Sequence, residues 1–160
     1  MVYNRVMKPF NIVLIEPEIP PNTGNIARLC AATGAVLHLV GTLGFSLDDR
    51  YLKRAGLDYW EFVALKRWPD LETLQAEATE GRFFYLSTKV ERSYIDAGFQ
   101  PGDYIVFGKE TKGLPEELLN ANPDTSFTIP MPSGKVRSLN LSTSAGIVLY
   151  EALRQCGGLG

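Results

Sequence analysis

Cysteine and histidine are scarce in this sequence of 160 residues, which contains two cysteines and one histidine. Cys30 and Cys156 lie far apart and form no C-x-x-C pair, so we expect neither a disulfide framework nor a bound metal. Each cysteine falls on an apolar helical stripe, which predicts buried free thiols. His38 lies inside a predicted strand without a partner motif, and we expect a hydrogen-bonded core or sheet-edge residue. This cysteine usage fits a reducing cytoplasm.

Long apolar runs are absent too. No run approaches the ~20 residues that cross a bilayer, so we expect no membrane partner. The N-terminus lacks an apolar region with a cleavage site, so no secretion signal is predicted. The formal net charge of −2 argues against a strongly basic coat, and a nucleic-acid partner would need a local basic patch.

The length and the hydrophobic fraction of 45% predict one well-cored domain. Residues 1–10 show no clear periodicity and are expected to be a frayed N-terminal leader, with the single domain at 11–160. Six predicted strands alternate with helical patterns, at 11–15, 35–40, 61–65, 82–88, 103–108 and 125–129. This alternation predicts an α/β fold, a mostly parallel six-stranded sheet with helices on both faces.

Helix signals fall between these strands. Asn22 is expected to cap the first helix and Gly34 to end it. Ser46 to Asp49 resembles a capping box for a helix that runs to about Ala55, and residues 70–80 form a polar amphipathic helix. Pro115 fits the first position of a further helix. Ser138 and Asn140 are both good N-cap residues for the apolar-striped helix that runs to Gln155.

Four predicted strands are followed by polar segments that carry cations: Arg28; Lys89 and Arg92; Lys109 and Lys112; Lys135 and Arg137. In a parallel sheet these segments gather at the carboxyl edge, where α/β proteins bind ligands. An acidic chain with one basic edge is typical of an enzyme that acts on an anionic substrate. Solvated loop charges remain the alternative for any one lysine.

Motif spacing excludes several kinds of chemistry. The loop 108–115 is not a P-loop, because Gly113 is followed by Leu114. No G-x-G-x-x-G follows a strand, and no Ser-His-Asp arrangement is present. Group transfer from a reactive cofactor, with the protein positioning the reactants, suits such a site. Glu110 is open to two interpretations, a ligand for an amino or hydroxyl group and a plain turn carboxylate.

A second basic cluster joins Arg50, Lys53 and Arg54 to nearby aromatic residues at 51, 59 and 60. It predicts either an RNA-binding patch with stacking rings or a solvated helix face beside core aromatics.

Three stretches in order resemble the SpoU branch of the SPOUT RNA methyltransferases: Asn22-Thr-Gly-Asn-Ile-Ala-Arg28, Tyr104 to Pro115, and Ile129-Pro-Met131 with Arg137-Ser-Leu-Asn-Leu-Ser142. The stretches 16–25, 44–49 and 56–59 are similar to the small tRNA wobble-nucleotide ribose methyltransferases (the TrmL group). The resemblance covers residues 11–155. Lys109, Trp60 and a longer loop at 132–136 depart from that group's pattern.

The resemblance implies a deep C-terminal trefoil knot and a homodimer whose active sites take residues from both subunits. It implies S-adenosyl-L-methionine as cofactor, with S-adenosyl-L-homocysteine as product, and tRNA as partner. By matching positions, the cofactor pocket would be lined by Leu86, Gly108, Ile129, Ser138 and Leu139. The catalytic set would be Asn22, Arg28, Glu110, Ser138 and Asn140.

The implied reaction is 2′-O-methylation of the wobble ribose of cytidine or uridine in tRNA. Arg28 is open to two roles, acting on the 2′-hydroxyl or, because a free guanidinium stays protonated, holding the adjacent phosphate and stabilising the developing alkoxide. The alternatives to this function are another tRNA or rRNA site, a non-catalytic knotted RNA-binding module, and an unrelated nucleotide-binding α/β protein. A dimer would double the basic cluster at Arg50, Lys53 and Arg54.

Overall fold

A six-stranded parallel sheet forms the centre of the computed structural model, which describes residues 7–55 and 59–160. The strands are β1 (Asn11–Ile15), β2 (Val36–Val40), β3 (Leu65–Trp68), β4 (Phe83–Leu86), β5 (Tyr104–Phe107) and β6 (Ser126–Phe127). Their order in the sheet is β3-β2-β1-β5-β4-β6, and every pairing is parallel. The predicted α/β class is confirmed.

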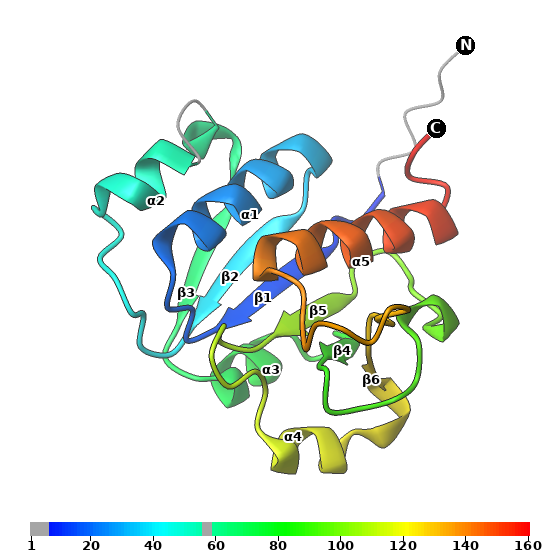
Figure 1. The fold of residues 1–160 in the computed structure, drawn as a ribbon. Coiled ribbons are helices and arrows are strands. Elements are labelled where there is room, and N and C mark those ends of the chain that lie inside the picture. The colour runs from blue at the N-terminus through cyan, green and yellow to red at the C-terminus, as the bar shows by residue number, and fades with distance from the viewer. Residues whose placement is uncertain (1–6, 56–58) are drawn as a thin grey trace.

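Helices cover both faces of this sheet (Figure 1). They are α1 (Pro20–Thr33), α2 (Arg50–Ala55), α3 (Leu71–Glu77), α4 (Glu116–Ala121) and α5 (Leu141–Gln155), with short 3₁₀ helices at Trp60–Phe62, Tyr94–Asp96 and Pro123–Thr125. One buried cluster joins α1 and α5 to the sheet, and a second joins α3 and α4 to the opposite face. α2 packs against α1.

The apolar run of β1 is explained by this two-sided packing. Ile12 and Leu14 belong to the cluster under α1 and α5, whereas Val13 belongs to the cluster under α3 and α4. All three side chains are fully buried. A central parallel strand buried on both faces therefore shows no alternation of polar and apolar residues.

The prediction of a strand at 61–65 was wrong. A 3₁₀ helix occupies Trp60–Phe62, and β3 begins only at Leu65. β3 is an edge strand that pairs with β2 alone, and its Lys66 and Arg67 are exposed. An edge strand with exposed charges carries a weak apolar signal, so the prediction fell on the more apolar residues before it.

Three helix starts also differ from the predictions. α1 begins at Pro20, with prolines in its first turn and Ile19 as N-cap, so Asn22 does not cap it. The residue that caps α2 is Asp49 rather than Ser46, because its Oδ1 atom accepts from the backbone N–H groups of Tyr51 and Leu52 at 2.8 and 3.3 Å. Pro115 is the N-cap of α4, one residue before its predicted place.

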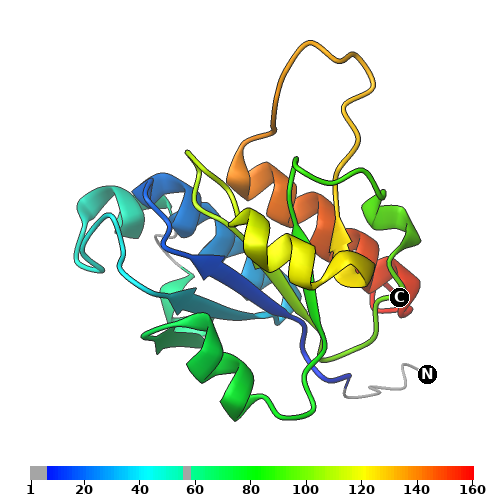
Figure 2. The ribbon, with the colours of Figure 1, turned by 90° about the horizontal axis from the view of Figure 1, so that it is seen from below.

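Two caps are confirmed. Gly34 ends α1 in the left-handed region with φ of 77°. Asn140 caps α5 by accepting from the backbone N–H groups of Ser142 and Thr143. Ser138 lies two residues earlier, in the segment between β6 and α5, which extends away from the body of the molecule in Figure 2.

The prediction for His38 is confirmed as well. The Trp68 indole donates to His38 Nδ1 at 2.9 Å, so the ring proton lies on Nε2, which donates to Asn11 Oδ1 at 2.8 Å. Burial is the main cause that lowers the pKa of His38 to about 4, and Lys66 adds to it.

The two cysteines differ. Cys30 is fully buried, which raises the pKa of its thiol to about 12, whereas Cys156 is only half-buried, contrary to prediction. Within residues 7–55 and 59–160 no cluster of acidic, histidine and cysteine side chains could hold a metal ion. In the same residues no helix has the length and apolar character needed to cross a membrane.

Two expectations have no test in this fold. The trefoil knot stays a prediction. The predicted leader falls largely on residues 1–6, which lie outside the described residues, as do residues 56–58 of the stretch 56–59. Of the leader's last residues, Phe10 is buried in the core.

Candidate active site

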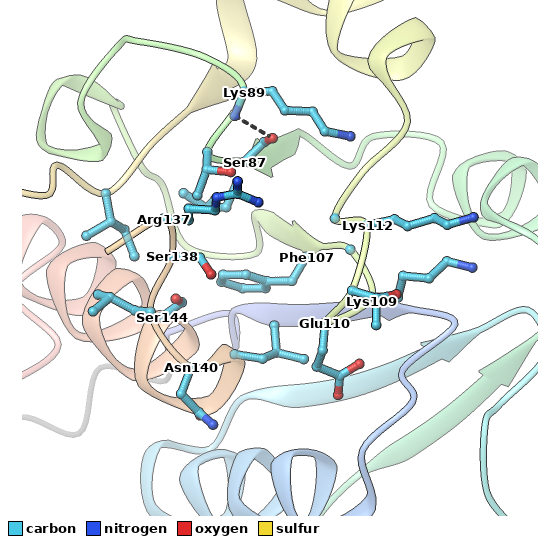
Figure 3. Close-up of a pocket in the computed structure, with 18 of the residues that line it drawn as sticks. Ser87, Lys89, Phe107, Lys109, Glu110, Lys112, Arg137, Ser138, Asn140 and Ser144 are labelled. Atoms are coloured by element: carbon cyan, nitrogen blue, oxygen red, sulfur yellow. Dashed lines mark hydrogen bonds between the residues drawn. The ribbon is translucent and has the colours of Figure 1, made fainter. Parts of the chain in front are cut away.

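A pocket of about 510 Å³ lies at the carboxyl edge of the sheet. Its walls are the segments that follow β4, β5 and β6, the residues that lead into α5, and Ile19 and Asn22 at the start of α1. Figure 3 draws 18 of these residues around the cavity and labels ten of them. The prediction that polar loops gather at this edge is confirmed.

All five residues expected to hold the cofactor line this pocket: Leu86, Gly108, Ile129, Ser138 and Leu139. Phe107 and Leu141 add further apolar surface. Ser138 and Ser144 lie on the α5 side, with Ser87 across the cavity (Figure 3). The pocket therefore combines apolar side chains with many polar and charged groups.

At one wall of the pocket, the backbone at Gly108 packs closely against the backbone of Gly113 and Leu114. A Cβ atom on Gly108 would lie 2.1 Å from the carbonyl carbon of Gly113 and 2.4 Å from the backbone nitrogen of Leu114. The loop turns back there, because the Gly113 N–H donates to the Lys109 carbonyl at 2.8 Å. Gly113 itself has φ of 65°. Both positions therefore require glycine.

A hydrogen-bonded chain connects three of the predicted catalytic residues. Glu110 Oε1 accepts from the Ile19 N–H at 3.1 Å and from Asn22 Nδ2 at 3.4 Å. Asn140 Nδ2 in turn donates to Asn22 Oδ1 at 2.9 Å. The chain links the β5–α4 loop, α1 and the start of α5, so it fixes the relative positions of three pocket walls. In this structure the Glu110 carboxylate holds the β5–α4 loop against the start of α1.

Of the predicted catalytic set, Arg28 is the member that does not line the pocket in the described part of the chain. It is exposed on α1, and its guanidinium carbon lies 5.0 Å from the centre of the Tyr59 ring. Asn22, Glu110, Ser138 and Asn140 do line the pocket. The structure thus brings four of the five together.

Four of the predicted loop cations line the pocket: Lys89, Lys109, Lys112 and Arg137. In Figure 3 the three lysine side chains extend to one side, away from α5. Lys89 Nζ donates to the Leu114 carbonyl at 2.7 Å, and Lys109 Nζ lies 3.9 Å from Glu16 Oε1. Arg92 instead stacks on Phe127.

The basic cluster of Arg50, Lys53 and Arg54 lies on α2, apart from the pocket lining. Arg50 donates to the Tyr51 hydroxyl at 2.9 Å. Lys53 Nζ lies 3.4 Å from Asp48 Oδ1, and both side chains are exposed. Both interpretations of this cluster stay open.

Sequence reasoning missed the contact between Glu18 and Thr111. Glu18 Oε1 accepts from the Thr111 backbone N–H at 3.1 Å and from its hydroxyl at 2.7 Å. These bonds, the side-chain bond first, hold the pKa of Glu18 below its ordinary value. Glu18 lies within the stretch 16–25 that carries the resemblance, and this position was the one available signal.

Comparisons with known proteins agree with this geometry. Residues 9–150 match the model of the SpoU rRNA Methylase family. The tRNA (cytidine(34)-2′-O)-methyltransferase of Methylovorus glucosotrophus (strain SIP3-4) is 52% identical over 147 residues, which are 91% of this chain and 95% of that protein.

Solved structures agree as well. One described as "Structural insights into the 2-OH methylation of C/U34 on tRNA" has a TM-score of 0.86 and 48% identity, and the match covers 92% of this chain and 96% of that one. The SpoU methyltransferase AviRb from Streptomyces viridochromogenes, in complex with AdoMet, has a TM-score of 0.79 and 25% identity over 95% of this chain and 62% of that one. Because the family match spans every strand of the sheet and the whole pocket, this chain belongs to the SpoU rRNA methylase family.

Proposed function

We propose that this protein is an S-adenosyl-L-methionine-dependent tRNA 2′-O-methyltransferase that acts on the ribose of cytidine or uridine at wobble position 34 of tRNA. The observation that carries the proposal is the pocket at the carboxyl edge, in a chain 52% identical to a relative named for methylation of cytidine 34. A cytoplasmic location, a homodimer and the trefoil knot belong to the same proposal.

The pocket residues fit S-adenosyl-L-methionine. The volume of about 510 Å³ suits a small-molecule ligand. Apolar walls are provided by Leu86, Ile129 and Leu139. Any side chain at position 108 would collide with the backbone of Gly113 and Leu114. When bound, the cofactor supplies an electrophilic methyl group on a sulfonium sulfur.

The protein's own contribution is positioning. The chain of Glu110, Asn22 and Asn140 holds three walls of the pocket in one geometry. A transfer that needs an attacking oxygen in line with the methyl group gains much from such fixed geometry. Ser138, which is exposed at the pocket, is available to hydrogen-bond to a reactant.

In this proposal, Arg28 of one subunit reaches the pocket of the second subunit. It is exposed on α1 and outside the pocket of its own chain, which agrees with a homodimer whose sites take residues from both subunits. From there its guanidinium would hold the phosphate beside the target ribose and stabilise the developing alkoxide, or act on the hydroxyl.

The basic cluster of Arg50, Lys53 and Arg54 is proposed to contact tRNA phosphates. The formal charge of the chain is −2, so one copy attracts RNA weakly. A homodimer presents the cluster twice.

The test is a map of ribose methylation in total RNA from a strain that lacks the gene. We expect methylation of the wobble ribose of some tRNAs to disappear and to return when the gene is restored. A second candidate is an rRNA site, which the description of the matching family model favours. An unchanged wobble ribose with a lost rRNA methyl group would select that candidate.

A further inference from the structure

We propose that Glu18 is a positioning residue of this active site, and that its carboxylate and that of Glu110 form a reciprocal clamp between two loops. The clamp joins the β1–α1 segment (residues 16–19) to the β5–α4 loop (residues 108–115). The inference rests on the proposed function, because it assigns the pocket formed by the second loop to S-adenosyl-L-methionine.

The hydrogen bonds of the clamp run in both directions. Glu110 Oε2 accepts from the Glu18 backbone N–H at 2.8 Å. Glu18 Oε1 accepts from the backbone N–H of Thr111 at 3.1 Å and from its hydroxyl at 2.7 Å. Each loop thus offers a carboxylate to the main chain of the other. Bonds to ionised acceptors are stronger than neutral ones, and the side-chain and backbone bonds from Thr111 hold the pKa of the Glu18 carboxyl below its ordinary value.

The β1–α1 segment is itself held rigidly. Glu16 has φ of 48°, a left-handed backbone at a residue other than glycine, which persists where the surroundings fix it. Its backbone N–H donates to the Val40 carbonyl at 2.8 Å. The loop after β2 holds the next residue: the Gly44 N–H donates to the Pro17 carbonyl at 2.9 Å, and a Cβ on Gly44 would lie 2.9 Å from Glu18 Cα.

The β5–α4 loop has the opposite character. Its residues 108–113 all line the pocket, and Thr111 and Lys112 at its tip are exposed. Lys109 Nζ adds a weak link to Glu16 at 3.9 Å. Glu18 lies outside the pocket lining in the described residues, so it acts on a ligand through this loop. The clamp therefore fixes the exposed β5–α4 loop, which forms a wall of the pocket, to the well-held β1–α1 segment.

The test measures binding of S-adenosyl-L-methionine alone, by titration calorimetry, to the wild type and three variants. Glu18→Ala removes the acceptor, and we expect affinity to fall about tenfold. Glu18→Gln keeps an oxygen at Oε1 and should bind within about twofold of the wild type. Glu80→Ala removes an exposed carboxylate from outside the pocket and should bind like the wild type.

A fourth variant guards against a folding defect in Glu18→Ala. Thr111→Val removes only the hydroxyl donor, and we expect about a threefold loss of affinity. When Thr111→Val is added to Glu18→Ala, we expect little further loss of affinity, because both changes remove the same hydrogen bond.

Three outcomes would overturn the clamp alone: wild-type affinity in Glu18→Ala, an equal loss in Glu18→Gln and Glu18→Ala, or fully additive losses with Thr111→Val. A wild-type protein that binds no S-adenosyl-L-methionine would overturn the proposed function and the clamp with it.

Discussion

The Asn140 side chain makes two kinds of contact, and two different substitutions distinguish their effects. Its Oδ1 atom accepts from the Ser142 and Thr143 N–H groups and so caps α5. Its Nδ2 atom donates to Asn22 Oδ1, and Asn22 Nδ2 faces Glu110. The first contact concerns helix stability, and the second concerns the geometry of the pocket.

Asn140→Asp keeps the cap and removes the donor to Asn22. If the Asn22 amide turned to donate to the new carboxylate, its oxygen would face Glu110. We therefore expect an unfolding free energy close to the wild type and methyl transfer reduced about tenfold or more. Asn140→Ala should lose about 1 kcal/mol of stability as well, because the cap is gone.

Urea unfolding and single-turnover methyl transfer measure the two effects. Asn120→Asp, on the exposed side of α4, is the matched control and should change neither. Full activity in Asn140→Asp would contradict the role given to the Asn22 contact.

His38 gives the protein a defined pH dependence of stability. The pKa of His38 is about 4 in the folded protein, below its ordinary value of 6.5. Below pH 6.5 the unfolded chain binds a proton that the folded protein takes up only near pH 4, so stability is lost as pH falls through this window. Between pH 7 and pH 5 this loss is about 2 kcal/mol.

His38→Gln removes the titration and retains a donor and an acceptor. Although the variant starts from lower stability, its unfolding free energy should fall less between pH 7 and pH 5 than that of the wild type. Urea unfolding at both pH values measures the difference. Equal losses in the two proteins would contradict the assignment of a neutral buried imidazole.

Residue types at the site were predictable from sequence, but their partners were not. Asn22 and Asn140 were recognisable as polar residues near strand and helix ends, and the spacing favoured capping roles for both. The cap at Asn140 is confirmed, whereas Asn22 is used in a bond to a residue 118 positions away. Glu18 and Thr111, 93 positions apart, meet because the sheet order brings β1 beside β5.

At the scale of elements, the β5–α4 loop is the part of the pocket most sensitive to added volume. Gly108→Ala places a Cβ atom 2.1 Å from the Gly113 carbonyl carbon, and this backbone contact is relieved only if the loop itself moves. We expect the loop to shift and cofactor affinity to fall at least about tenfold.

Gly98→Ala is the control for Gly108→Ala. A Cβ on Gly98 meets nothing within 4 Å, and its affinity for S-adenosyl-L-methionine should equal that of the wild type. Calorimetric titration of both variants measures the difference. Unchanged affinity in Gly108→Ala would show that this wall does not contact the cofactor.

The interior elements were predictable because burial determines their sequences. β1 and β2 pack on both faces, so their apolar runs gave their bounds to within a residue. β3 is an edge strand with exposed charges, and its position was missed. Helix starts that depend on a side-chain acceptor, such as Asn140, followed the known preferences, whereas α1 starts at two prolines without a side-chain cap.

At the scale of the whole molecule, the hydrophobic periodicity of the sequence predicts the elements but not how the chain connects them in space. The alternation of strands and helices predicted a parallel sheet, and the structure confirms it. Neither the proposed knot nor the proposed homodimer follows from any repeat or spacing, and knots are rare enough that general rules of chain connection exclude them. The exposed position of Arg28 outside its own pocket is the structural observation that agrees with a second subunit.

The most direct test is the transfer of labelled methyl groups from S-adenosyl-L-methionine to bulk tRNA, with the labelled nucleoside mapped. Wild type is compared with Arg28→Ala and with Arg67→Ala, a change at an exposed arginine on the edge strand β3. We predict label on the wobble ribose with the wild type and Arg67→Ala, and about a hundredfold less with Arg28→Ala. Binding of S-adenosyl-L-methionine by a wild-type protein that labels no tRNA would contradict the proposed reaction.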